Sequence, residues 1–249
     1  MKNAKNFYDL WKKEEQAFFS GWDFSYIHGR MKEESLPWDY NAEAKKLIKN
    51  ATAVLDMGTG GGEILSMLGP FPKHTIATEG WHPNVPVARK KLEPLGIKVV
   101  AVDESGKLPF EDDEFDLVLN RHSGFDEKEV FRILQKNGIF FTQQVSGNNL
   151  QDLIKEFGVD TQGKEWNANT EKRQLEKVGF KVEIAKDWKG KVEFTDVGAI
   201  VYFLKAIPWI VSDFSVDKYL PILEKLQRKI NSGERLIFIE TRWLIKARK

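Results

Sequence analysis

A glycine-dense loop that directly follows an apolar segment constrains this chain more than any other feature. Residues 54–63 read Val-Leu-Asp-Met-Gly-Thr-Gly-Gly-Gly-Glu. Glycine adopts positive φ angles at no steric cost, and it lets a ligand approach bare backbone. A strand that runs into such a loop, with a helix opening at Glu63, predicts a ligand site at the carboxyl end of the first strand of a doubly wound sheet.

The pattern around this loop predicts the α/β class. Short apolar segments alternate with helical stretches, as in a parallel sheet with crossover helices. The predicted strands are Ala53–Asp56, Thr75–Thr78, Val99–Val102, Phe115–Leu119, Ile139–Gln143, Phe180–Trp188 and Leu236–Ala247. The predicted helices are 5–19, Asn41–Lys49, Glu63–Leu68, Val85–Leu95, Glu127–Gln135, Leu150–Phe157, Thr170–Val178, Thr195–Ala206 and Val216–Ile230, and Trp22–Tyr40 is predicted to be irregular.

We interpret residues 1–249 as a single domain, because no linker or internal repeat divides the chain. Residues 1–49 would form an N-terminal helical and aromatic cap. Residues 50–146 would form the ligand-binding half, and residues 147–249 the C-terminal half with a helical insertion at 195–232.

The composition excludes several classes of protein. The chain has no cysteine, which rules out disulfides, thiolate zinc sites and a cysteine nucleophile. His28, His74 and His82 are scattered without ligand spacing, so no catalytic metal is predicted. A net charge of +1 gives no overall attraction to nucleic acid or to an anionic membrane. The charged N-terminus does not resemble a signal peptide and the longest apolar run, 197–211, is too short to span a bilayer, so we expect a cytoplasmic protein.

Two cofactors compete for the glycine loop. In a dinucleotide fingerprint that starts at Gly58 and Gly60, the third glycine would fall on Glu63, whose carboxylate would repel a pyrophosphate. The loop therefore favours a ligand without phosphates, and S-adenosylmethionine is such a ligand. Asp56 would accept hydrogen bonds from its ammonium group. The alternative is a tight strand-to-helix turn that binds nothing.

Two further acids follow neighbouring strands. Glu79 ends the second predicted strand and is placed to accept from ribose hydroxyls. Asp103 follows the third, where its carboxylate would lie near an adenine amino group. Each acid alone is as readily a solvated strand end, but three at successive strand ends support a nucleoside site.

These residues resemble the class I S-adenosylmethionine-dependent methyltransferases, and most closely the methyltransferase type 11 group related to quinone-biosynthesis enzymes and their bacterial relatives. The motifs that carry the resemblance are VLDMGTGGGE (54–63), IATEG (76–80), VVAVDESGKLPFEDDEFDLVLNRHS (99–123) and EVFRILQKNGIFFTQQV (129–145). The resemblance implies a seven-stranded, mostly parallel sheet in the order 3-2-1-4-5-7-6, with the last strand antiparallel and helices on both faces. It also implies methyl transfer from S-adenosylmethionine.

Carried over by position, the glycines would line the methionine and ribose, Glu79 would bind the ribose, and Asp103 with Glu104 would flank the adenine. The segment from Asn120 to His122 would lie beside the transferable methyl group. The complete predicted cofactor-binding set is Asp56, Gly58, Thr59, Gly60, Gly62, Glu79, Gly80, Asp103, Glu104 and Asn120.

His122 and Arg121 are the predicted catalytic residues. An imidazole titrates near neutral pH, so His122 is a candidate general base, although it would equally serve by packing or hydrogen bonding against the cofactor. Arg121 would bind an anionic group of the substrate or the cofactor carboxylate. The sequence departs from the family here, because Asn-Arg-His-Ser replaces a short apolar run and no Asn-Pro-Pro-Tyr tetrad follows.

Two aromatic segments are predicted to cover the site, 22–40 and 195–211, although aromatic residues at helical spacing are more often core. The candidate substrate residues are Arg30, Trp38, Tyr40, Gln143, Tyr202 and Trp209. The sequence thus predicts methyl transfer to a small-molecule acceptor. The alternatives are a nucleic-acid or ribosomal-RNA methyltransferase, a non-catalytic S-adenosylmethionine-binding protein and a nicotinamide oxidoreductase. For the first of these, residues 242–249 offer a weak basic cluster.

Overall fold

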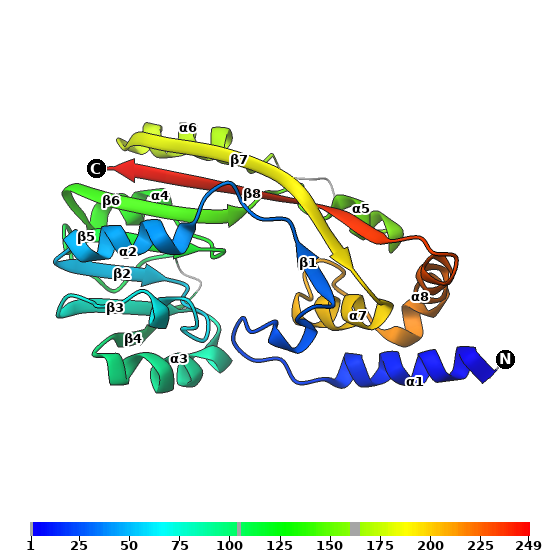
Figure 1. Ribbon diagram of the computed structural model, residues 1–249. Helices are drawn as coiled ribbons and strands as arrows, with labels where there is room; N and C mark the ends of the chain where they lie inside the picture. Colours follow the sequence, from blue (N-terminus) through cyan, green and yellow to red (C-terminus); the bar gives the residue numbers. More distant parts are fainter. Residues whose placement is uncertain (1, 104–105, 160–164) are drawn as a thin grey trace.

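A computed structural model describes residues 2–103, 106–159 and 165–249, and its centre is a single eight-stranded sheet (Figure 1). The strands are β1 (Met31–Glu33), β2 (Ala53–Met57), β3 (His74–Glu79), β4 (Lys98–Ala101), β5 (Phe115–Arg121), β6 (Leu134–Val145), β7 (Lys181–Phe194) and β8 (Leu236–Arg248). Their order across the sheet is β1-β7-β8-β6-β5-β2-β3-β4.

The predicted order of seven strands is confirmed, with one strand added at an edge. Strands β2 to β6 pair in parallel, and β8 is antiparallel to both β6 and β7. The added strand β1 pairs with the outer part of β7, where Met31 lies opposite Phe194. The sequence prediction of an irregular segment at 22–40 was wrong here, because a three-residue strand is too short to show an alternating pattern.

The helices agree with the predicted positions except at one place. They are α1 (Lys2–Gln16), α2 (Tyr40–Asn50), α3 (Val85–Leu92), α4 (Glu127–Ile133), α5 (Gln151–Glu156), α6 (Ala168–Val178), α7 (Val197–Ala206) and α8 (Val216–Asn231). The helix predicted at 63–68 is instead a single 3₁₀ turn, Leu65–Met67. Glycines precede this segment and Gly69-Pro70 follows it, so too few residues remain to nucleate an α-helix.

Helices cover both faces of the parallel strands, and each face has its own apolar core. On one face, α2 and α3 pack through Ile48 and Leu92. On the other face, α4 and α6 pack through Ile133 and Leu175. All five residues of β2 are buried between the two cores, as expected for a parallel strand with helices on either side.

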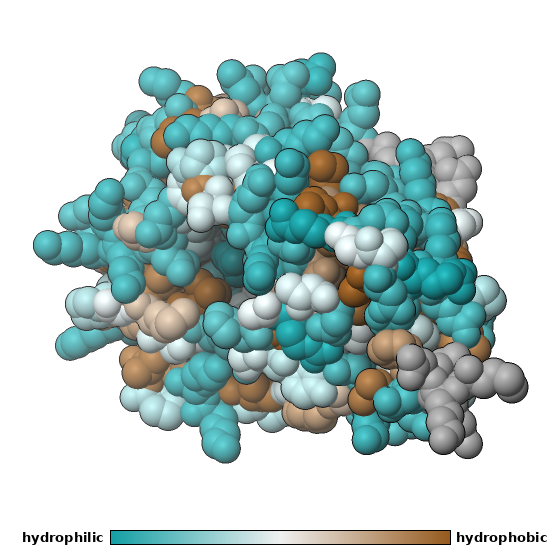
Figure 2. Space-filling view, turned by 45° about the vertical axis from the view of Figure 1, so that its right-hand side comes forward, coloured by the Kyte–Doolittle hydropathy of each residue, from teal (hydrophilic) through white to brown (hydrophobic). Residues whose placement is uncertain are grey.

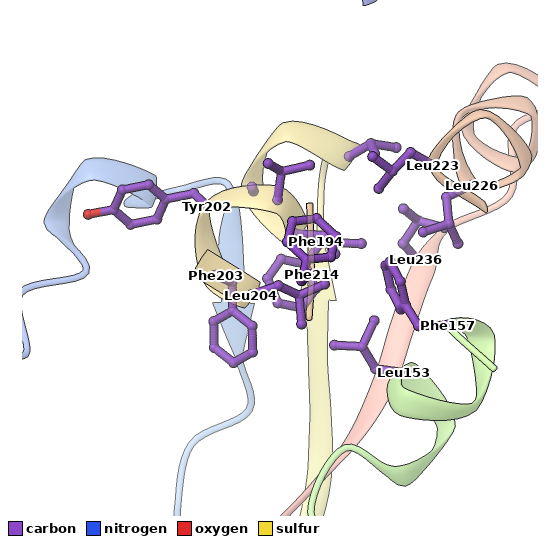
Figure 3. Close-up of a cluster of buried hydrophobic side chains, with 14 of the residues drawn as sticks. Leu153, Phe157, Phe194, Tyr202, Phe203, Leu204, Phe214, Leu223, Leu226 and Leu236 are labelled. Atoms are coloured by element: carbon purple, nitrogen blue, oxygen red, sulfur yellow. The ribbon is translucent and has the colours of Figure 1, made fainter. Parts of the chain in front are cut away.

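A third apolar cluster lies beyond the parallel strands. The outer halves of β7 and β8 extend past them and gather α1, α5, α7 and α8, which lie to the right in Figure 1. Figure 3 shows side chains of this cluster, among them Phe194 of β7, Leu223 of α8 and Leu236 of β8. Every residue of α7 except Lys205 is buried. From here on, the cap means the helices α1, α5, α7 and α8, the outer halves of β7 and β8, and residues 17–39.

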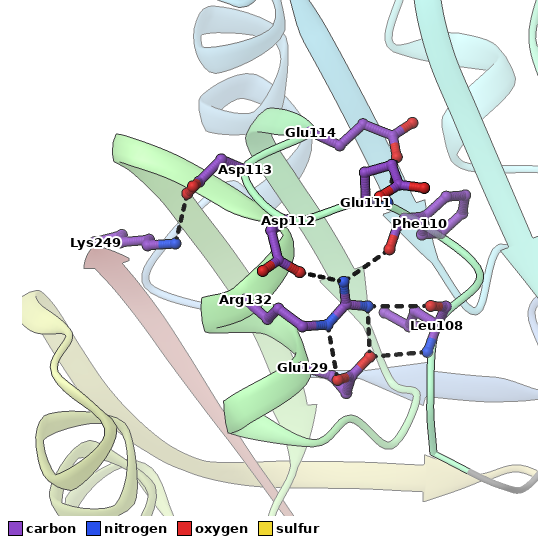
Figure 4. Close-up of polar contacts among 9 residues, drawn as sticks. All are labelled: Leu108, Phe110, Glu111, Asp112, Asp113, Glu114, Glu129, Arg132 and Lys249. Carbon is purple, nitrogen blue, oxygen red and sulfur yellow. Dashed lines mark hydrogen bonds and ion pairs between the residues drawn. The ribbon is translucent and has the colours of Figure 1, made fainter.

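The segment before β5 is attached to α4 by one arginine (Figure 4). The Arg132 guanidinium donates to the carbonyl oxygens of Phe110 at 2.7 Å and Leu108 at 3.1 Å. It also pairs with Glu129 at 2.8 Å and Asp112 at 2.9 Å. Five donors in a rigid plane suit such a set of acceptors, so Arg132 fixes the path of the chain into β5.

The visible face in Figure 2 is mostly hydrophilic, with hydrophobic residues in small separate groups. In the part of the chain that the structure describes, no helix combines the length and the apolar character needed to cross a bilayer.

Candidate functional site

The glycine loop after β2 requires glycine on steric grounds. Gly58, Gly60 and Gly62 have φ angles of 68°, 64° and 80°, which side chains rarely adopt. A Cβ on Gly58 would lie 2.1 Å from Ser123 Oγ, and one on Gly62 would lie 2.8 Å from Leu92 Cγ. The loop therefore leaves its backbone bare between β5 and α3.

Glu79 at the end of β3 holds this loop in place. Its Oε2 accepts from the Gly60 amide at 2.6 Å, and its Oε1 accepts from the Trp81 amide at 2.7 Å. Burial raises the pKa of Glu79, and these amides act in the opposite direction. Each carboxylate oxygen can accept a second hydrogen bond, so the group keeps capacity for sugar hydroxyls.

Asp56 is buried in β2, below the start of the loop. Burial raises the pKa of Asp56 to about 7, because a carboxylate loses its hydration there. A cationic ligand beside this carboxyl group would favour its ionised form. The position thus suits an ammonium or sulfonium group and disfavours a phosphate.

The remaining residues of the predicted cofactor set lie around the same strand ends. The Thr59 amide donates to Thr78 O at 2.9 Å. Gly80 directly follows β3, and a Cβ there would meet only ordinary contacts, so its neighbours do not demand glycine. Asp103 follows β4 and is exposed. Glu104 lies outside the described residues.

Asn120 is fully buried in β5 and links three strands. Its Nδ2 donates to Met57 O at 3.2 Å, and its Oδ1 accepts from Thr142 Oγ1 at 2.9 Å. Gln144 Nε2 also donates to Asn120 Oδ1. These contacts fix β5 against β2 and β6, directly beneath the candidate catalytic residues.

His122 follows β5 with a left-handed backbone, at φ 57°. Its Nε2 lies 3.2 Å from Gln143 Nε2, and Gln143 Oε1 accepts from Trp38 Nε1 at 2.8 Å. Burial lowers the pKa of His122 well below its usual value, and the positive charges of Arg121 and Arg242 add to this effect.

Arg121 is half-buried, and burial lowers the pKa of its guanidinium. Among the described residues, no carboxylate forms an ion pair with it. Arg242 nearby differs, because it pairs with Glu240 at 2.6 Å and Glu33 at 3.5 Å. Arg121 is thus a cation with spare hydrogen-bonding capacity beside His122.

Three of the predicted substrate residues lie together at this place. Trp38 and Gln143 contact each other, and Tyr40 OH donates to Asn120 O at 3.4 Å. The Tyr40 ring stacks on Phe141 with centroids 4.8 Å apart.

The other three predicted substrate residues have their nearest partners in the cap. Arg30 pairs with Asp196 at 2.7 Å and with Glu14 at 2.9 Å. Tyr202 is buried against Tyr26. Trp209 is 67% exposed and lies 5.8 Å from Trp22, centroid to centroid. The substrate role of these three residues stays a prediction. The contacts of Arg30 and Tyr202 with other cap residues do not support it.

Sequence reasoning missed Trp22. A Cβ on Gly60 would lie 2.5 Å from Trp22 Cδ1, so this indole lies directly on the glycine loop. The adjacent Gly21 amide donates to Asn84 Oδ1 at 3.3 Å. The sequence gives no signal for this contact beyond the aromatic character of the segment, because it depends on how the cap folds back over the sheet.

Comparisons with known proteins agree with this arrangement. Residues 55–142 match a family model described as a methyltransferase domain. This region therefore resembles the methyltransferase domains of the class I S-adenosylmethionine-dependent family. No curated protein matches the sequence.

Solved structures share the fold of this chain at low sequence identity. A proposed methyltransferase of Bacillus halodurans C-125 superposes with a TM-score of 0.60 at 19% identity, covering 84% of this chain and 98% of the other. The YcgJ protein of Bacillus subtilis gives 0.58 at 17% identity, with 84% and 97% covered. A functionally unknown protein of Deinococcus radiodurans R1 gives 0.57 at 14% identity, with 88% and 90% covered.

The methyl donor of this family is S-adenosylmethionine, and the residues present fit it. The bare glycine backbone would hold the methionine and ribose, and Glu79 retains acceptor capacity for the ribose hydroxyls. Asp56 is a buried acid that a cation would ionise. The cofactor supplies a methyl group already activated by a positive sulfur.

Proposed function

We propose that this methyltransferase methylates a small molecule that carries an anionic group. The observation that carries the proposal is the enclosure of the strand ends. Asn120, Gln143 and Gln144 are at most 2% exposed, and Trp38 of the cap lies directly on Gln143. Such a cover favours a small acceptor over a folded macromolecule.

The chain's own contribution to the reaction is alignment. The glycine loop, Asp56 and Glu79 would hold the cofactor, and the residues after β5 would hold the acceptor beside it. Fixing two reactants in the geometry of attack is worth up to about 7–11 kcal/mol in well-oriented systems. No metal ligand is needed for such a role.

Arg121 supports the choice of an anionic acceptor. A partly buried guanidinium without a carboxylate partner among the described residues binds an oxyanion strongly, because its lost hydration is restored by charge-assisted hydrogen bonds. The oxyanion would come from the acceptor. The carboxylate of the cofactor's methionine group is the other source, and the two are separable by experiment.

The first test is calorimetry with S-adenosylmethionine, S-adenosylhomocysteine and NAD on protein stripped of carried-over ligand. We expect binding of the first two and none of NAD. Methyl-donor consumption across a panel of paired anionic and neutral metabolites then identifies the acceptor. Absence of nucleoside binding would contradict the proposal, and binding without turnover on any acceptor would favour a non-catalytic cofactor-binding protein.

The Arg121→Gln variant tests the anion site, with Arg235→Gln as its control, because Arg235 pairs with Glu193 on the surface. We expect Arg121→Gln to raise KM for the anionic acceptor at least tenfold and to change S-adenosylhomocysteine affinity less than threefold. A loss of S-adenosylhomocysteine affinity with unchanged acceptor KM would assign the guanidinium to the cofactor carboxylate instead.

A further inference from the structure

Three side chains form a hydrogen-bonded line from the cap to the end of β5. Trp38 Nε1 donates to Gln143 Oε1 at 2.8 Å, and Gln143 Nε2 lies 3.2 Å from His122 Nε2. An indole nitrogen is only a donor, so it requires the oxygen of the Gln143 amide to face it. The amide NH₂ group must then face His122.

This orientation decides the state of the imidazole. An amide NH₂ group is only a donor, so the His122 Nε2 that it approaches must offer a lone pair. A neutral imidazole with a free lone pair on Nε2 carries its proton on Nδ1. Burial and the charges of Arg121 and Arg242 independently disfavour the protonated ring.

The backbone holds the ring and the amide in this relation. The His122 amide donates to Gln143 O at 2.9 Å, so the two residues that share the side-chain contact also share a backbone bond. His122 also has a left-handed backbone, which a residue other than glycine keeps where the surrounding structure over-determines it.

We infer that Gln143, oriented by Trp38, is a positioning residue that holds His122 as the neutral Nδ1–H tautomer, so that His122 meets the reactants as a hydrogen-bond donor. Its Nε2 lone pair is engaged by Gln143, which leaves no free site for a proton taken from the acceptor. The general-base role predicted from the sequence would require this contact to break. The geometry favours the other role weighed there, a hydrogen bond toward the bound molecules.

The inference deepens the proposed function. It rests on that function only where it says that the His122 Nδ1–H donates to a bound reactant. The tautomer itself is a property of the free protein. Failure of the two proposals is therefore distinguishable: S-adenosylhomocysteine calorimetry tests methyl transfer, and the protonation state of the ring tests the role of Gln143.

The decisive measurement is a long-range ¹H–¹⁵N correlation spectrum of protein labelled on histidine, at pH 7. Protonated and unprotonated ring nitrogens have well-separated shifts, and the sequence has only four histidines. The signals lost in His122→Asn belong to His122, and asparagine is a residue that tolerates a left-handed backbone. We expect a protonated Nδ1 and an unprotonated Nε2. A protonated Nε2 or an imidazolium in the wild type would overturn the inference.

Gln143→Glu provides the second arm, because a carboxylate has no N–H to donate. We expect its His122 Nε2 to become protonated, either by a change of tautomer or by formation of the imidazolium. Gln135→Glu adds the same charge at the other end of β6 and should leave the His122 signals unchanged. Unchanged His122 signals in a folded Gln143→Glu variant would contradict the positioning role.

Turnover gives a third readout once an acceptor is identified. The amide nitrogen of asparagine occupies about the place of Nδ1, so His122→Asn preserves a donor there. We expect at least tenfold higher turnover for His122→Asn than for His122→Ala. Equal loss in both variants, with normal S-adenosylhomocysteine binding, would speak against a donor role.

Discussion

Gly62 and Gly96 share a φ of 80° but differ in what surrounds them. A Cβ on Gly62 would lie 2.8 Å from Leu92 Cγ, whereas a Cβ on Gly96 would meet nothing within 4 Å. Alanine at Gly96 should cost only backbone strain, about 1–2 kcal/mol. Alanine at Gly62 should cost about 1–3 kcal/mol more, because the core must also make room.

Urea denaturation of both variants measures this difference. Equal free energies of unfolding would show that the contact with Leu92 relaxes without cost. The comparison also tests the loop, since Gly62→Ala should weaken S-adenosylhomocysteine binding and Gly96→Ala should not.

The raised pKa of Asp56 predicts a pH-dependent affinity. Between pH 4 and 7 the folded protein holds a proton that the unfolded chain releases, so this group lowers stability as pH rises through that range. A cationic ligand instead requires the ionised form. S-adenosylhomocysteine binding should therefore tighten about tenfold between pH 6 and 8.

Calorimetry at both pH values checks this prediction, and Asp56→Asn supplies the control. Its affinity should be weak and independent of pH over the same interval. A wild-type affinity that is equally flat would place the ligand's ammonium group elsewhere.

At the residue scale, the sequence alone indicates which candidate positions lie together when they belong to one local motif. The spacing of the glycines and of Asp56 places them at one strand end, and positive φ confirms the need for glycine at three positions. The contact between Trp38 and Gln143 joins residues 105 apart, and no local pattern encodes it. The same holds for Trp22 on Gly60.

At the scale of elements, we expect the protein to lose stability when the planar guanidinium of Arg132 in α4 is replaced. Arg132→Lys keeps the charge but not the simultaneous bonds to Phe110 O, Leu108 O and Glu129, so we expect a loss of about 1–3 kcal/mol in the free energy of unfolding. Denaturant titration measures it.

Arg89→Lys is the matched control, because Arg89 pairs with Glu93 at 3.8 Å on the exposed surface. Its effect should stay within about 0.5 kcal/mol. Similar losses in the two variants would mean that Arg132 contributes through its charge alone.

The elements themselves were predictable where an apolar pattern is long enough to show its period. The parallel strands and all eight α-helices that the structure describes fall where the pattern placed them, with shifted ends. β6 starts at Leu134, directly after α4 ends, because the chain pairs with β5 without an intervening loop. β7 runs to Phe194, beyond its predicted end, because its outer half pairs with β1 and β8, which only the folded chain brings together.

At the scale of the whole molecule, β7 and β8 cross from the sheet into the cap. Cap and sheet should therefore unfold together, as expected of a single domain. Leu223→Ala removes a fully buried side chain from the cap cluster and should cost about 2–5 kcal/mol. Calorimetry should still show one transition, at a lower Tm.

Leu95→Ala serves as the control, since Leu95 is 47% exposed and should change Tm little. Two separate transitions in Leu223→Ala would show that the cap melts independently, and residues 1–249 would then comprise two folding units.

The position of β8 in the sheet also bears on how the protein is made. The last strand in the sequence lies between β6 and β7, so neither of its neighbours can complete its pairing until residues 236–248 have left the ribosome. Domains usually begin to fold during synthesis, starting from the N-terminal end. Here the edges of β6 and β7 that face β8 must stay unpaired until residues 236–248 have been synthesised, and unpaired strand edges of this kind are prone to aggregation.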